Sequence, residues 1–533
     1  MTAVKLYDTT LRDGMQGQGM SLSAAEKVRV VHALDQLGVQ FIEAGFPASN
    51  PKEAELFELL AGEQLEQAAI CAFGMTRRRG VEADQDEALR LLAATFAPVV
   101  TLVGKTWSLH LEKVTRVSRE ENLAMIGESV AYLCDEGKRV MYDAEHFFDA
   151  WGDDRDYSLR CLRQAHEAGA EVLVLCDTNG AHLPGQIGSI VAEVHESLPD
   201  AELGIHCHND LECGVANALA AVDAGARQVQ GTVNGYGERC GNSNLISILP
   251  SLQLKLGYEV VSPGKLEDLS SVSHFVADLL NVPVDPDQAY VGRNAFAHKG
   301  GMHVAGVAAD ARTFEHMDPG EVGNSRVVLA SELSGKATVL ARAGELGLEL
   351  DDEAARHAVE TLKQREHEGY HYEAADASFD LLLRQEAGEF KPLFTFESFK
   401  VQTQLRAGGE VETEAIVKIR VGGERYVTVA EGNGPVNALD KALRAAITGH
   451  FPELEDIELT GYRVRILDTA HGTGAGTRVL LDSKRGDSGD SWGSIGVSEN
   501  IIEASWEALV DSLSYAFQNG GSGPGTESGK PND

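Results

Sequence analysis

The chain has 533 residues and a formal charge of −36, because 82 acidic residues outnumber 46 lysines and arginines. Hydrophobic residues make up 43% of it, which is enough for large cores and excludes a disordered or fibrous chain. This acidic balance argues against nucleic-acid and anionic-membrane partners, because phosphate contacts need clustered Lys and Arg.

The N-terminus has no basic region followed by an apolar run, so we expect no secretory signal. No stretch approaches the roughly 18 uninterrupted apolar residues of a membrane-spanning helix. The seven cysteines include no CxxC pair. An odd number without that spacing is typical of reduced thiols rather than of a disulfide framework or a zinc finger. We therefore expect a soluble protein of the cytoplasm.

From residue 4 to residue 257, short apolar runs rich in β-formers alternate with amphipathic helical stretches. Most runs are apolar nearly throughout, as expected of parallel strands covered on both faces. Eight βα units in about 250 residues predict an α/β fold, a (β/α)8 TIM barrel over residues 1–261. A doubly wound sheet usually has fewer strands and a Gly-rich first turn. The predicted strands are 4–7, 40–45, 69–74, 99–104, 139–144, 171–177, 203–208 and 227–233.

The remaining chain is predicted to form three regions. Residues 262–391 are helical and charged, with clear periods at 266–280 and 351–364, and are predicted to be helical linker subdomains with a flap loop at 295–306. In residues 392–517, three strand-like runs precede a helix and this order recurs once, which predicts a C-terminal α+β domain of two βββα units. A repeat of this kind after a barrel indicates a ligand-sensing or dimerising module. The Gly/Ser/Pro-rich residues 518–533 are predicted to be disordered. The predicted strands are 393–406, 411–421, 424–431, 457–469, 475–484 and 491–498.

Polar side chains follow several barrel strands, where the active sites of such barrels lie. His206 and His208 share one face of the seventh strand because strand residues i and i+2 point the same way, whereas Cys207 points away. With Asp13 after the first strand, they form a mixed N/O set suited to Mn²⁺, Zn²⁺, Co²⁺ or Mg²⁺. An isolated His-x-His is more often an ordinary strand end, but the charged residues at the same rim favour a metal site.

Other residues at this rim have two interpretations each. Arg12 is a surface cation or a guanidinium that polarises a carbonyl beside the ion. Glu145 interacts with a helix dipole or acts as a general acid or base. Thr178 caps the next helix or binds a substrate carboxylate. The glycine-rich residues 234–242 form a plain turn or a rim loop that places Asn242 at the ion.

The segment 295–306 lies outside the barrel and contains two histidines, His298 and His303, next to glycines. They are either ordinary loop residues or part of a flap that carries a proton-transfer base over the barrel mouth. The pattern alone leaves both interpretations open.

Six motifs together resemble one family, the acyl-CoA-condensing metallolyases of the aldolase-type barrel class, which holds the 2-isopropylmalate, homocitrate and citramalate synthases. The βββα repeat resembles the C-terminal allosteric domain of the isopropylmalate and citramalate members. The resemblance covers the chain except its tail. The motifs are DTTLRDGMQ (8–16), IEAGFP (42–47), CDTNG (176–180), HCHND (206–210), NGYGERCGN (234–242) and VGRNAFAHKGGMHV (291–304).

The resemblance implies a divalent metal ion and its ligands. Asp13, His206 and His208 match the ligand positions of the family, and Asn242 is expected close to the ion. Arg12 matches the residue that polarises the keto oxygen of the acceptor.

The resemblance also implies substrate and acid–base residues. Thr178 is expected to bind the acceptor carboxylate, and we place Gln16 in the same substrate site. Glu145 matches the acidic residue at the end of the fifth strand. His303 matches a histidine proposed as a base, which reaches the site from the other protomer, so we expect a homodimer whose flap acts in trans. Phe314 stands where the family usually has Tyr, a departure that bears on any role for that hydroxyl.

Within the family, YDAEHFFDAW, LCDTNGAHLP and NAFAHKGGMHVAGV are most similar to the longer citramalate synthases. This branch implies acetyl-CoA and pyruvate as substrates, a place in isoleucine biosynthesis and isoleucine as effector. One alternative is 2-isopropylmalate synthase, which uses the bulkier 2-oxoisovalerate. A lyase of the hydroxymethylglutaryl-CoA type is a second, but such chains end soon after the barrel. The third, a non-catalytic amino-acid sensor, is disfavoured by the intact ligand set.

Overall fold

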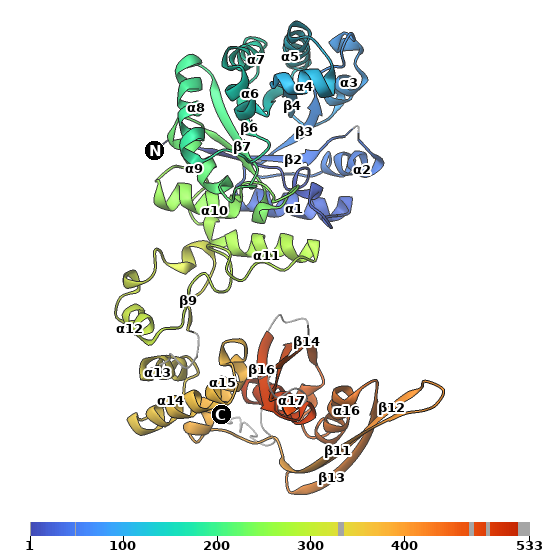
Figure 1. The fold of residues 1–533 in the computed structure, drawn as a ribbon, viewed down its shortest axis with the longest axis vertical. Coiled ribbons are helices and arrows are strands. Elements are labelled where there is room, and N and C mark those ends of the chain that lie inside the picture. The colour runs from blue at the N-terminus through green and yellow to red at the C-terminus, as the bar shows by residue number, and fades with distance from the viewer. Residues whose placement is uncertain (1, 48, 329–334, 468–473, 487–490, 521–533) are drawn as a thin grey trace, which may run out of the picture. The chain divides into compact units, whose positions relative to one another are not determined.

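The computed structural model describes residues 2–47, 49–328, 335–467, 474–486 and 491–520. The chain divides into two compact units (Figure 1). The first contains residues 1–296 and 317–325, and the second contains residues 297–316 and 326–533. Residues 262–296, grouped above with the linker region, therefore belong to the barrel unit. No helix in the described ranges has both the length and the apolar character needed to span a bilayer.

The first unit is built on a closed barrel of eight parallel strands in sequential order, so the predicted α/β barrel is confirmed (Figure 1). The barrel closes where β1 pairs with β8. Every strand lies within two residues of its predicted range, because each was an apolar run bounded by polar turns. The strands are β1 (Lys5–Asp8), β2 (Phe41–Gly45), β3 (Ala69–Met75), β4 (Val99–Lys105), β5 (Arg139–Glu145), β6 (Val172–Asp177), β7 (Glu202–Cys207) and β8 (Gln228–Gly231).

Helices surround this barrel and are set by local sequence signals. Helix α1 begins at a capping box, in which the Ser23 hydroxyl accepts from the Glu26 amide, and ends at Gly38, whose φ of 100° suits glycine. The helices of this unit are α1 (Ala24–Leu37), α2 (Pro51–Leu60), α3 (Glu87–Ala94), α4 (Ser108–His110), α5 (Arg119–Asp135), α6 (Phe147–Asp153), α7 (Arg155–Glu167), α8 (Pro184–Ser197), α9 (Gly214–Asp223), α10 (Leu245–Pro250) and α11 (Leu269–Leu280).

The barrel strands contribute to two separate cores. An outer core packs strand residues against the surrounding helices. A smaller inner core fills the barrel with Tyr7, Phe41, Val99, Met141 and Val174, all buried. Layers of side chains of this kind close the interior of such barrels, so the open polar end lies where the strands terminate.

The second unit begins with short helices and a small strand pair. The segment 295–306, expected to be a loop, contains β9 (Ala297–His298) and the start of α12 (Gly301–Ala309). This difference follows from the sequence after Gly301, which is rich in Ala and Val and has no proline to stop a helix. The other strand and α-helices before the βββα repeat are β10 (Val327–Val328), α13 (Lys336–Glu345), α14 (Asp352–His367) and α15 (Asp376–Glu386).

The C-terminal part contains two three-stranded antiparallel sheets, each followed by a helix that packs on it, so the predicted βββα repeat is confirmed. The predicted disordered tail differs at its start, because residues 518–520 lie in α17, and its residues 521–533 lie outside the described residues. The elements are β11 (Thr395–Leu405), β12 (Val411–Val421), β13 (Glu424–Gly432), α16 (Pro435–Ile447), β14 (Ile457–Ile466), β15 (Thr477–Arg485), β16 (Ser491–Ser498) and α17 (Ile501–Gly520).

Candidate active site

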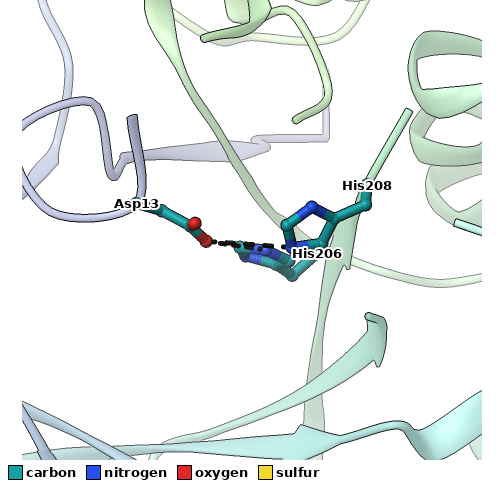
Figure 2. A group of neighbouring side chains, drawn as sticks. All are labelled: Asp13, His206 and His208. Atoms are coloured by element: carbon teal, nitrogen blue, oxygen red, sulfur yellow. Dashed lines mark ion pairs between the residues drawn. The ribbon is translucent and has the colours of Figure 1, made fainter. Parts of the chain in front are cut away.

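Three predicted metal ligands meet at the mouth of the barrel. Asp13 follows β1, His206 lies on β7 and His208 directly follows β7, and the carboxylate faces both imidazoles (Figure 2). The Oδ2 atom of Asp13 is 3.4 Å from Nε2 of His206 and 4.0 Å from Nε2 of His208, and all three side chains are buried. Ligand atoms about 2.1 Å from one ion lie about 3 to 3.5 Å apart, so this group can hold a metal ion after a small adjustment.

A buried glutamine orients one of these imidazoles. Nδ1 of His206 lies 3.0 Å from Oε1 of Gln230, and Nε2 of Gln230 donates to Asp143 at 3.1 Å. Because an amide oxygen only accepts hydrogen bonds, Nδ1 of His206 carries the proton in the neutral ring. The lone pair of Nε2 then faces Asp13, which is the tautomer that binds a metal.

The charges of the site favour the ligand forms of Asp13 and His208. For His206, burial acts to lower the pKa, but the Asp13 carboxylate outweighs burial and raises it. Burial acts to raise the pKa of Asp13, but Arg12 and the two histidines outweigh burial and hold that pKa well below its usual range. Burial, followed by repulsion from His206, lowers the pKa of His208 to about 4. A carboxylate and a neutral imidazole are the protonation states that coordinate metal ions.

Asn242, in the glycine-rich loop, lies beside His208 of this group. An isolated antiparallel bridge pairs it with His208. Its side chain is buried, and its Nδ2 donates to the carbonyl of Tyr236 at 3.3 Å. Oδ1 of Asn242 has no hydrogen-bond partner among the described residues. Because buried polar atoms are rarely left unpaired, this oxygen fits a cation or its coordinated water.

Arg12 is fixed next to the same carboxylate. Its Nε donates to Oε2 of Glu43 at 2.6 Å, and its Nη1 is 3.4 Å from Oδ2 of Asp13. The guanidinium carbon lies 4.1 Å from the centre of the Phe73 ring. Glu43 is fully buried and also accepts from the Thr9 hydroxyl. The sequence motif IEAGFP contained Glu43, but only the structure shows that it holds Arg12.

Glu145 belongs to a second group at the rim. It ends β5 and forms an ion pair with Lys105, its neighbour in register at the end of β4. Nδ1 of His110 lies 3.9 Å from Oε2 of Glu145, and the ring centres of His110 and His146 are 4.3 Å apart. Burial, with a contribution from His146, lowers the pKa of His110. Sequence reasoning missed Lys105 and His110, because neither belongs to a recognisable motif.

Thr178 and Gln16 lie at the same end of the barrel. The Thr178 hydroxyl accepts a hydrogen bond from the backbone amide of His146 at 2.9 Å. It does not cap the next helix, because α8 begins at Pro184, so that interpretation is wrong. The hydroxyl proton of Thr178 is therefore left to donate elsewhere. Gln16 ends the 3-10 turn Gly14–Gln16 and is exposed.

The two histidines of the segment 295–306 belong to the second unit. His303 is exposed on α12, and its ring stacks on Phe314 with the ring centres 4.1 Å apart. The aromatic residue that stands where the family usually has Tyr therefore contacts the predicted base. His298 instead pairs with Glu315, with 2.9 Å between Nε2 and Oε1. The catalytic role of His303 stays a prediction.

Three family comparisons match successive parts of the chain. Residues 3–276 match the HMGL-like family, and residues 290–369 match the homocitrate synthase post-HMGL domain-like family. Residues 373–517 match the LeuA allosteric (dimerisation) domain. The first match covers the whole barrel, and the third covers the two βββα units.

The chain is also similar to full-length curated proteins. It is 47% identical to the (R)-citramalate synthase of Synechocystis sp., over 97% of this chain and 96% of that protein. It is 45% identical to the (R)-citramalate synthase of Geobacter sulfurreducens, over 97% of this chain and 98% of that protein. Identity to the 2-isopropylmalate synthase of Carboxydothermus hydrogenoformans is 33%, over 96% of this chain and 97% of that protein.

The proposed ligand group can be tested by titration with Mn²⁺ in a calorimeter. We expect one ion to bind the native chain and binding to be lost in His206→Ala. Gln230→Leu should weaken binding by about 10- to 100-fold, because the His206 ring loses the partner that orients it. The matched control is Gln85→Leu, at an exposed position, which should bind as the native chain does. Equal affinity in Gln230→Leu and the native chain would contradict the orienting role.

Proposed function

Because the chain belongs to the HMGL-like family, and within it to the (R)-citramalate synthases, we propose that it condenses acetyl-CoA with pyruvate to give citramalate and CoA. In this Claisen-type acyl transfer, the methyl carbon of acetyl-CoA forms a bond to the keto carbon of pyruvate, and water then hydrolyses the thioester. The observation that carries this proposal is the high identity to (R)-citramalate synthases over nearly their whole length. The lower identity to 2-isopropylmalate synthases argues against the branched acceptor.

The buried group at the barrel mouth fits a divalent metal ion. We assign Asp13, His206 and His208 as its ligands, with Asn242 adjacent, and expect Mn²⁺, Mg²⁺, Zn²⁺ or Co²⁺. A bound ion would supply a Lewis acid that polarises the keto oxygen of a 2-oxo acid. Arg12, held by its contacts to Glu43 and Asp13, places a fixed positive charge where the alkoxide develops.

The neighbouring residues bind the acceptor and move protons. Thr178, whose hydroxyl accepts from the His146 amide, keeps its own proton free to donate to the carboxylate of pyruvate. We assign Gln16 to the same substrate-binding site. Glu145, paired with Lys105, is assigned as an acid or base for the acetyl methyl group, together with His303 supplied by a partner subunit.

Keto-acid specificity separates the proposed activity from its closest alternative. We expect pyruvate to give the highest initial rate of CoA release, ahead of 2-oxobutyrate and 2-oxoisovalerate. A chelator should abolish the rate with every acid, and added divalent ion should restore it. A preference for 2-oxoisovalerate would assign the chain to the isopropylmalate reaction instead.

Removal of a metal ligand should abolish turnover without unfolding the chain. We expect Asp13→Ala and His206→Ala to lower kcat by at least about 1000-fold, because both the polarising ion and its geometry are lost. Circular dichroism should remain that of the native chain, since the inner core of the barrel is unchanged. Activity near the native level in either variant would contradict the site.

We also propose that residues 392–517 form a regulatory domain that binds isoleucine and that the protein acts as a homodimer in isoleucine biosynthesis. The match to an allosteric (dimerisation) domain supports this proposal. All seven cysteines are free thiols, which supports the expected cytoplasmic location.

A cavity of about 350 Å³ between the two βββα units suits such an effector. The amino end of α16 lies at its edge, where backbone amides can donate hydrogen bonds to a carboxylate. Apolar side chains from β14 and β15 offer contacts to a branched side chain. The residues that line the cavity are Asn433, Gly434, Pro435, Val436, Asn437, Asp440, Leu459, Tyr462 and Leu481.

Filling this cavity should relieve inhibition. A Cβ at Gly434 meets no atom within 4 Å and its backbone is extended, so Gly434→Leu adds bulk without strain. We expect the isoleucine concentration for half inhibition to rise at least about tenfold. Gly408→Leu is the matched control, because its Cβ also meets no atom within 4 Å and it lies outside the cavity. Unchanged inhibition in Gly434→Leu would place the effector elsewhere.

A further inference from the structure

The barrel unit holds a second group of potential metal ligands, which shares no residue with the Asp13 group. His110 ends α4, Glu145 ends β5 and His146 follows it directly. Each side chain offers one ligand atom, and these atoms lie within 4.8 Å of one another. Two imidazoles and a carboxylate, with a further position open, form a donor set that zinc enzymes use. Because Mg²⁺ prefers oxygen ligands to imidazole, this set favours Zn²⁺ and similar ions.

His110 presents an unpaired nitrogen to this group. Its Nδ1 atom is buried and forms no hydrogen bond to any described residue. Oε2 of Glu145, at 3.9 Å, is too distant for one. The ring stacks on Trp107, with the ring centres 5.6 Å apart and the planes at 26°. Because buried polar atoms are rarely left unpaired, this nitrogen fits a ligand that the polypeptide itself does not supply.

His146 is oriented by a carboxylate, as metal-binding histidines usually are. Its Nδ1 lies 3.1 Å from Oδ2 of Asp149. Because a carboxylate only accepts hydrogen bonds, Nδ1 carries the proton of the neutral ring and Nε2 keeps its lone pair. The backbone of His146 is left-handed, with φ of 55°. Residues other than glycine rarely adopt this conformation, and such residues gather at functional sites.

Lys105 supplies the positive charge that this group now contains. Its ammonium forms an ion pair with Glu145, its neighbour in the register of β4 and β5. Ligand atoms around one ion lie about 3 to 3.5 Å apart, so binding must draw the three ligand side chains closer together. The ammonium repels a divalent ion that shares the same carboxylate. An ion at this group therefore has to replace Lys105 as the partner of Glu145.

We propose that His110, Glu145 and His146 form a second metal site, which binds Zn²⁺ or a similar transition-metal ion in exchange for the Lys105 ammonium. Binding depends on these side chains alone. The consequence for turnover rests on the proposed function, in which Glu145 is an acid or base. A carboxylate held by a metal ion cannot take a proton from the acetyl methyl group, so this ion inhibits the condensation.

Calorimetric titration with Zn²⁺ tests the site in the full chain after Asp13→Ala and His206→Ala have removed the first site. We expect this background chain to bind one Zn²⁺ ion. His110→Asn should weaken that binding at least about 100-fold, because loss of a ligand costs more than loss of an orienting partner. The matched control is His32→Asn, since His32 also pairs with a glutamate but lies outside the group. Equal affinity with and without His110→Asn would overturn the site.

The exchange with Lys105 predicts a gain of affinity, which misfolding does not produce. In the background chain, Lys105→Met should tighten Zn²⁺ binding at least about tenfold, because no internal cation then competes for Glu145. Lys5→Met is the matched control, since Lys5 and Glu202 form a similar ion pair at the starts of β1 and β7. It should leave the affinity unchanged. Unchanged or weaker binding in Lys105→Met would overturn the exchange.

Turnover tests the inhibitory role. With saturating Mn²⁺, added Zn²⁺ should slow CoA release by the native chain, and the fraction of the rate that is lost should be smaller in His110→Asn. An equal fraction in both chains would place the inhibition at the Asp13 group and overturn the role. No CoA release by the native chain with any keto acid would instead overturn the proposed function, and the titrations would still decide whether the second site binds a metal ion.

Discussion

The Arg12 guanidinium sets the charge balance of the barrel mouth, because it forms ion pairs with the carboxylates of both Asp13 and Glu43. Three acids that include Asp143 are buried in this small space, and burial alone would favour their neutral forms. Burial and the nearby Glu43 raise the pKa of Asp143 to about 7, whereas the pKa of Asp13 is held low. Arg12 and the two histidines therefore keep Asp13 in the ionised form that a candidate metal ligand needs.

Much of this architecture could be predicted from the sequence. The barrel strands were recognisable because both faces of each are covered, which makes them continuous apolar runs. The candidate metal ligands were recognisable because His206 and His208 were expected on one strand face, and because the ends of parallel strands meet at one rim. The alternation in β12 placed Ala415 and Val417 on a buried face, where the structure has them.

Residues that act through a partner on another strand could not be predicted. Gln230 is one of two glutamines in β8, and its role depends on the register that sets it beside His206. Lys105 contacts Glu145 only because β4 and β5 pair with those residues opposite each other. The small residues after Gly301 read equally well as a loop, and only the backbone hydrogen bonds of the fold show a helix.

The two βββα units share one hydrophobic core, in which Leu443 of α16 and Leu509 of α17 belong to the same cluster as the inner faces of both sheets. Neither unit can shift against the other without opening that core to water, which is costly in proportion to the apolar area exposed. We therefore expect the two units to move together as one rigid body rather than about a hinge between them. A shift of one sheet therefore requires a matching shift of the other.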